Sequence, residues 1–207
     1  MKVAIILLSI VSLSFSAPQP RKIFHEHAED FLELIMQESN DEIMQIFESY
    51  LEFEEFTKSL DYMTTSDFKQ LVYEMESLPE FKAVVDFLEN DNIDILYFID
   101  RLNEIIEEIQ EVKRTRQEIS GKDMTAYIND CIAVFPKDKL VALFEEKVAE
   151  DEEFRVAIEN LQSDEWDQIW NALWENETFL EEANILLENG IDLQVLLVEL
   201  KAVFGQF

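Results

Sequence analysis

Apolar residues recur at helical spacing along most of the chain. From about residue 24 onward they return every three or four positions, as on one face of a helix. Only three Gly and four Pro occur, so few residues interrupt this pattern. The pattern predicts an all-α protein with helices at about 24–38, 41–59, 66–77, 79–90, 93–118, 123–134, 137–149, 152–162, 164–175, 177–189 and 191–204.

The last predicted helix is apolar nearly all the way round. Its apolar positions are Ile191, Leu193, Val195, Leu196, Leu197, Val198 and Leu200. A surface helix keeps one apolar stripe and a polar back, so this segment is expected to have apolar neighbours on every side. The spacing does not distinguish packed protein side chains from another apolar neighbour.

The chain contains an internal repeat. Residues 54–107 align without a gap on 152–205, at a constant offset of 98 residues, and the apolar positions coincide. Candidate helix N-caps coincide at Thr65 and Ser163, and candidate left-handed helix ends coincide at Asn92 and Gly190. The sequence therefore predicts two tandem repeats of about five to six helices, with repeat 1 at 28–118, a link at 119–123 and repeat 2 at 124–205, together forming one domain.

The N-terminus has the pattern of a secretory signal peptide. Lys2 precedes the apolar run "VAIILLSIVSLSF", which is too short to span a bilayer and is followed by small residues before Ala17. We expect a signal peptide at 1–16, a lead-in at 17–27 and a secreted protein. The alternatives are a buried N-terminal helix and a membrane anchor.

Composition limits the partners of the protein. The net charge of −30 repels nucleic acid and anionic membranes, so neither is an expected partner. An apolar content of 48% with 16 Phe is too high for a disordered acidic tail. Cys131 is the only cysteine, so an internal disulfide is impossible and stability must come from packing. A monomer is the favoured oligomeric state.

No catalytic or metal-binding set of residues emerges from the sequence. His25 and His27 are two residues apart, so on a helix they point in nearly opposite directions and cannot chelate one ion together. They are also the only histidines, so we expect no catalytic residues, no metal and no cofactor. Cys131 has the position of a small core residue. Asn176, in "NET", is a candidate for glycosylation or simply a helix N-cap.

Motifs of the form "FENxxIDxLxxxxxL" near the end of each repeat resemble one family. In the first repeat they comprise Phe87-Leu88-Glu89 through Ile93-Asp94 with Phe98 and Leu102, and in the second Leu186 through Gly190-Ile191-Asp192 with Leu196 and Leu200. With the signal peptide and the repeat length, they make the chain similar to the insect allergen repeat family, which includes the cockroach group-1 allergen, midgut microvillar proteins and nitrile-specifier proteins. The resemblance covers roughly residues 28–205.

The resemblance implies a helical shell around a large apolar cavity that holds fatty acids or phospholipids. The residues it suggests as the cavity lining are Phe68, Phe98, Leu102, Trp166, Trp170, Leu196 and Leu200. The first expectation is a non-enzymatic lipid carrier or sequestrant, secreted into the insect midgut lumen or onto the microvillar surface. The alternatives are a nitrile-specifier-like modifier of glucosinolate breakdown and a structural coat protein of the microvilli. An ordinary core without a cavity is the remaining alternative for the fold.

Overall fold

The structure is a computed structural model that describes residues 24–93 and 120–205, and in these two ranges all regular elements are α-helices. The predicted signal peptide and nearly all of the predicted helix 93–118 lie outside the described residues. The all-α prediction is confirmed. The helices are α1 (Phe24–Tyr50), α2 (Glu54–Met63), α3 (Ser66–Ser77), α4 (Pro79–Asn90), α6 (Met124–Ala133), α7 (Lys137–Glu150), α8 (Glu152–Asn160), α9 (Asp164–Glu175), α10 (Glu177–Glu188) and α11 (Leu193–Val203).

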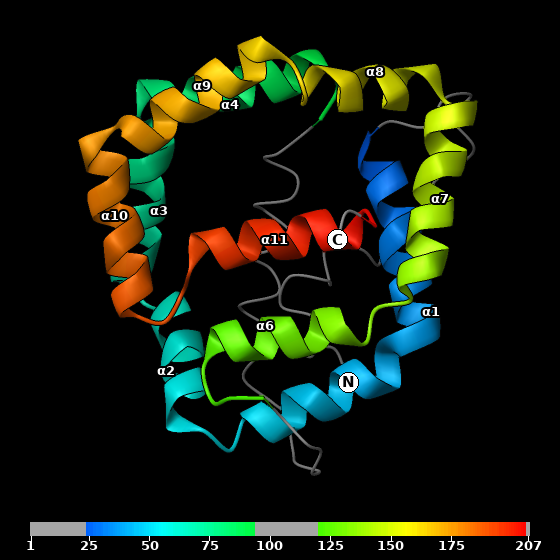
Figure 1. The fold of residues 1–207 in the computed structure, drawn as a ribbon. Helices are drawn as coiled ribbons and strands as arrows, with labels where there is room; N and C mark the ends of the chain where they lie inside the picture. The colour runs from blue at the N-terminus through cyan, green and yellow to red at the C-terminus, as the bar shows by residue number, and fades with distance from the viewer. Residues whose placement is uncertain (1–23, 94–119, 206–207) are drawn as a thin grey trace.

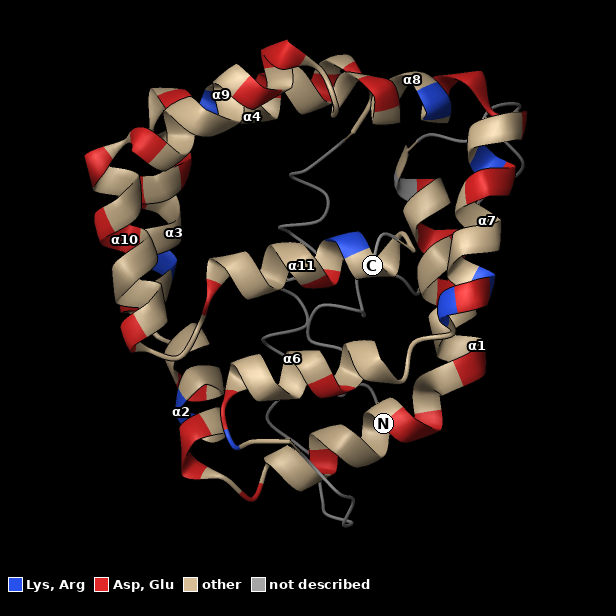
Figure 2. Cartoon of the chain, in the orientation of Figure 1, with Lys and Arg blue, Asp and Glu red and all other residues tan. Residues whose placement is uncertain are grey.

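The outer helices make a frame that two inner helices cross (Figure 1). On the frame, α3 packs against α10, α4 against α9, and α8 meets α7, which packs against α1. Inside it, α11 lies against α6, and both contact α1. Acidic residues are spread along the helices of the frame, whereas α6 and α11 contain few charged residues (Figure 2). None of the described helices is long and apolar enough to cross a membrane.

Aromatic side chains fill the core where the inner helices meet the frame. Phe47 and Tyr50 of α1, Phe56 of α2 and Tyr127 of α6 form one cluster, with ring centroids 4.9 Å apart for Phe56 and Tyr127. Phe47, Tyr50 and Phe56 are fully buried. Each such side chain contributes about 1.5–3 kcal/mol through burial, so this cluster fixes α1, α2 and α6 together without a disulfide.

Several helix ends lie where the sequence predicts them. The Thr65 and Ser163 side chains accept hydrogen bonds from Phe68 N and Trp166 N, as N-caps of α3 and α9. Asn92 has φ 57° and Gly190 has φ 81°, so both predicted left-handed helix ends are confirmed. The bounds 66–77, 79–90 and 164–175 match the predictions residue for residue.

The predicted break after residue 38 is wrong. Instead of two helices at 24–38 and 41–59, one helix runs from Phe24 to Tyr50, and the break comes at 51–53. The polar residues that suggested a break are held inside the helix, because the Ser39 hydroxyl donates to the Val134 carbonyl at 2.6 Å. Tertiary packing against α6 and α7 thus overrides the local signal.

Candidate functional site

The inner helix α11 has an unusual distribution of exposed apolar side chains. Val198 is 55% exposed and Leu200 is 52% exposed, although α11 runs across the middle of the frame. Leu193 and Leu197 lie on the Leu200 side of the helix and are half-buried. Ala202, about 200° around the helix from Leu200, is buried in the core, and so is Val203. The helix therefore has one side in the core and an apolar side, formed by Leu193, Leu197 and Leu200, that the described protein only partly covers, whereas Val198 lies about 200° around the helix from Leu200.

The buried side of α11 contains a carboxyl group, that of Glu199. Its side chain is 4% exposed, and its Oε2 atom has no hydrogen-bond partner in the described structure. Tyr127 and Cys131 of α6 interact with it electrostatically and share a hydrogen bond with each other. Burial raises the pKa of Glu199 to about 8, because the charged form loses hydration and no cation in the described part of the chain compensates for this loss.

The sequence analysis counted α11 as apolar and missed Glu199. A helical-wheel reading does contain the signal, since Val195, Glu199, Ala202 and Val203 follow the i, i+4, i+7, i+8 spacing of one face. A single acid at such a position predicts a buried carboxyl.

Three tryptophans form a row along α9. Trp166 stacks on Trp170 with ring centroids 5.4 Å apart, and Trp170 lies 6.0 Å from Trp174. The row continues across helices, because Phe87 of α4 lies 5.3 Å from Trp166 and Phe179 of α10 lies 5.2 Å from Trp174. Trp166 and Trp170 are half-buried, and Trp166 also packs against the core.

The residues suggested as a cavity lining occupy separate places. Phe68 is buried and packs edge-on against Tyr62, 5.7 Å away, in the core around α3. Trp166 and Trp170 lie together on α9, and Leu196 and Leu200 lie on α11, where Leu196 is half-buried against the core. Phe98 and Leu102 lie outside the described residues. Their assembly into one cavity stays a prediction.

Asn176 is engaged at the start of α10. Its side-chain oxygen accepts from Phe179 N at 2.9 Å, and its Nδ2 donates to Glu80 of α4 at 3.0 Å. The N-cap prediction is thus confirmed. Glycosylation stays a prediction; a sugar joined to Nδ2 would have to displace the contact with Glu80.

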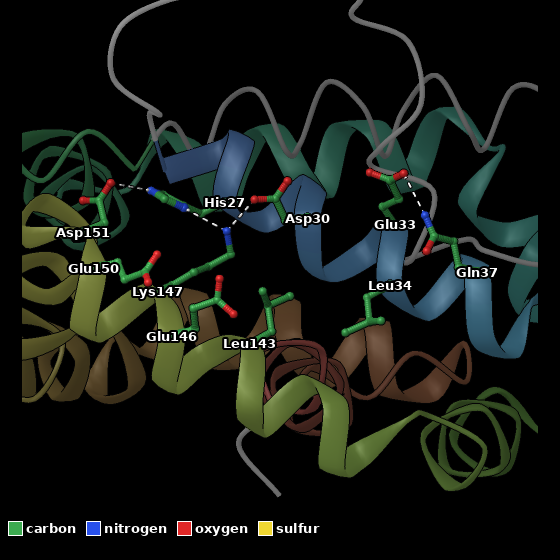
Figure 3. A pocket seen from close by; sticks show the side chains of 10 residues that line it. All are labelled: His27, Asp30, Glu33, Leu34, Gln37, Leu143, Glu146, Lys147, Glu150 and Asp151. Carbon is green, nitrogen blue, oxygen red and sulfur yellow. Dashed lines mark hydrogen bonds and ion pairs between the residues drawn. The ribbon is translucent and has the colours of Figure 1, made fainter.

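A polar groove of ≈ 580 Å³ lies between α1 and α7 (Figure 3). At its floor Lys147 is 8% exposed and donates to His27 Nδ1 at 3.2 Å and to Asp30. On the other side of the ring, His27 Nε2 lies 3.2 Å from Asp151 Oδ2. The remaining lining residues are Glu33, Leu34, Gln37, Leu143, Glu146 and Glu150.

This polar cluster has a structural explanation. Asp151 caps α8 by accepting from Phe154 N at 2.9 Å, and this bond, followed by the nearby His27, lowers the pKa of Asp151. Lys147 is held in a contact with Asp30, and the groove lining includes no hydroxyl or thiol. The cluster links α1 to α7 and α8. His27 and Lys147 are 120 residues apart in the sequence, so local sequence patterns did not predict their contact.

No metal site is found either, since the described residues contain no group of three or more potential ligands from His, Cys, Asp or Glu. His27 is instead engaged with Lys147 and Asp151, while the side chain of His25 lies outside the description. Cys131 is 2% exposed and thus a core residue, as predicted.

Comparison with known proteins identifies the family. No curated protein matches the chain. A family described as insect allergen related repeat, nitrile-specifier detoxification, matches residues 24–197, which include all or part of each described helix. The chain therefore belongs to the insect allergen related repeat family.

Proposed function

We propose that the protein is a secreted lipid-binding protein that holds fatty acids or phospholipids against the apolar face of α11. The observation that carries this proposal is the exposure of Leu200, on the same side as the half-buried Leu193 and Leu197, on a helix inside the frame. An apolar ligand that removes such side chains from water gains about 25 cal/mol per Å² of apolar surface. The acidic frame would keep the loaded protein soluble, in the lumen or at the microvillar surface of the midgut.

The α11 face is proposed to belong to a cavity shared by two repeats. Two contacts support this arrangement: α4 packs against α9, and α3 packs against α10. At the offset of 98 residues, α3 corresponds to α9 and α4 corresponds to α10. Replacing each helix by its counterpart therefore turns the contact of α4 with α9 into the contact of α10 with α3. Such pairing is what a two-fold arrangement of equivalent halves requires. Leu196, Leu200, Trp166 and Trp170 are the proposed lipid contacts in the described residues, whereas Phe68 is buried in the core around α3.

The proposal is tested by the dependence of stability on lipid. A ligand that binds only the folded state stabilises it by about 2.7 kcal/mol at a hundredfold excess over Kd, equivalent to roughly 5–10 °C in Tm for a chain of this size. Native mass spectrometry of protein from its own tissue should show bound lipid. Stripping this lipid should lower Tm, and oleic acid should restore it. Equal melting temperatures with and without lipid would identify α11 as an ordinary core helix.

A matched pair of variants places the site on α11. Leu200→Asp puts a charge on the proposed lipid face, where burial under an acyl chain leaves it unpaired, so oleic acid should no longer raise Tm. Gln194→Asp adds the same charge at an exposed polar position of the same helix and should leave the lipid effect intact. Loss of the effect in both variants would point to general electrostatic repulsion instead of a site.

The family description favours a second function, a modifier of glucosinolate breakdown that directs the products to nitriles. The lining of the polar groove between α1 and α7 contains no hydroxyl or thiol. This function predicts that the purified protein, mixed with a glucosinolate and its hydrolase, increases the fraction of nitrile. A lipid carrier leaves this fraction unchanged.

A further inference from the structure

Glu199 lies where α11 docks onto α6, and this position makes the contact sensitive to its charge. The side chain shares the buried face of α11 with Ala202 and Val203, and Oε2 is unpaired. The free-energy cost of burying the neutral carboxyl is close to that of burying an amide of the same size. An ionised carboxylate in the same place would be removed from water and would have no counter-ion among the described residues.

The elements packed against α11 provide no compensating cation in the described residues. From α6, Tyr127 and Cys131 face the carboxyl, and both are acids that would add negative charge if they ionised. Asp130 of α6 acts on Cys131 and accepts from the Tyr50 hydroxyl of α1 at 2.7 Å.

Helices α1 and α10 also leave the carboxyl uncompensated. The contact of α1 with the end of α11 is aromatic, with Phe24 and Phe31 lying against Phe204. No described charged or titratable group of α1 or α10 shifts the pKa of Glu199, which burial raises. On α11 itself, Lys201 is exposed and about 200° around the helix from Glu199. Ionisation would therefore leave the charge without a partner.

We propose that Glu199 is a pH-sensitive latch: its neutral form holds α11 on α6, and loss of its proton loosens α11 and releases the bound lipid. This inference rests on the proposed lipid-binding function, because α11 also carries the proposed lipid face. The direction is fixed by the environment. A carboxyl that is easier to protonate in the folded state stabilises the fold at low pH, and this contribution is lost as pH rises toward about 8.

The first test needs no ligand. Unfolding by urea is followed by circular dichroism between pH 5 and 9 for the wild type, Glu199→Gln and Glu188→Gln, the last removing an equal charge at an exposed site. The comparison uses the equilibrium constant for unfolding, the ratio of unfolded to folded protein. The ratio of this constant in the wild type to that in Glu199→Gln should rise by up to about tenfold per pH unit between pH 5 and 8 and then level off. Glu188→Gln should follow the wild type. Parallel curves for the wild type and Glu199→Gln would overturn the latch.

Glu199→Leu provides a second, independent variant. It removes titration with an apolar side chain, so it stays informative if the buried amide of Glu199→Gln disturbs folding. The free energy of unfolding of Glu199→Leu should therefore lack the decrease between pH 5 and 8 that we expect from ionisation of Glu199 in the wild type. If it retains the wild-type profile, the latch is refuted.

The second test measures release, using a fluorescent fatty-acid methyl ester, which has no titratable group. Wild-type protein should bind the ester more weakly at pH 9 than at pH 6, whereas Glu199→Leu should bind it equally at both. Absence of ester binding at both pH values would refute the lipid-binding function, while the unfolding test would still decide the role of Glu199. Binding by the wild type that is independent of pH would refute the latch alone.

Discussion

Gly190 allows a severe test of the fold, because it combines a left-handed backbone with a close approach to another helix. Its φ is 81°, and the following Ile191 N donates to Leu186 O at 2.9 Å, closing the end of α10. A Cβ added here would overlap the Ser59 hydroxyl oxygen of α2. Ser59 is 1% exposed, which leaves little room for it to move.

The matching position in the first half provides the control. Asn92 has φ 57°, and Ile93 N donates to Leu88 O at 2.9 Å, so α4 ends in the same way. Asn92→Ala should lower the free energy of unfolding by about 1 kcal/mol, the cost of a left-handed alanine. Gly190→Ala carries that cost and about 1–3 kcal/mol of overpacking, for a total of roughly 2–4 kcal/mol.

Urea denaturation followed by circular dichroism measures both variants, and a double-mutant cycle with Ser59→Ala isolates the clash. With the hydroxyl gone, the Cβ of residue 59 is 3.6 Å from the new methyl group, an ordinary contact. Ser59→Ala should therefore recover about 1–3 kcal/mol in the Gly190→Ala background, beyond its own effect. Additive effects of the two substitutions, or equal losses in Gly190→Ala and Asn92→Ala, would show that α2 does not lie against this helix end.

Two further outcomes follow from buried contacts. Ser39→Ala should cost about 0.5–1.5 kcal/mol in urea denaturation, because the half-buried Val134 carbonyl loses the hydroxyl that donates to it at 2.6 Å; a loss close to zero would mean that water replaces the hydroxyl. Burial raises the pKa of the Cys131 thiol, so iodoacetamide should label the native protein at pH 8 far more slowly than the urea-unfolded chain, as mass spectrometry can determine. Rapid labelling of the native protein would contradict this burial.

The sequence predicts helix ends well where the signal is local. Thr65 and Ser163 are N-caps because their hydroxyls reach the backbone three residues along, and this depends on nothing distant. The end of α1 depends on distant contacts. Ser39 and Asn40 favour a break locally, but the hydroxyl of Ser39 has a partner 95 residues away, and the helix continues.

The candidate sites also divide into features that local sequence predicts and features that depend on distant contacts. Periodicity indicates that α11 is apolar on most sides, but it does not determine which side the core covers, because this depends on the placement of α6 and α1. The exposure of Leu200 and the burial of Ala202, two residues apart, therefore come only from the structure. The same is true of Lys147, whose partners His27 and Asp30 lie on the first helix.

Packing alone gives no reason for a carboxyl at residue 199. At the offset of 98 residues its counterpart is Arg101, so the repeat pattern does not require an acid there either. A pKa of about 8 against 4.5 in a model peptide corresponds to a cost of at most about 5 kcal/mol once the carboxyl is ionised. Leucine at this position would avoid that cost and fit the apolar face of Ala202 and Val203. If the contact between α11 and α6 served only to stabilise the fold, Glu199→Leu would increase the free energy of unfolding at every pH without loss of function. A latch predicts a different balance: Glu199→Leu gains stability at pH 8, yet retains at high pH a ligand that the wild type releases.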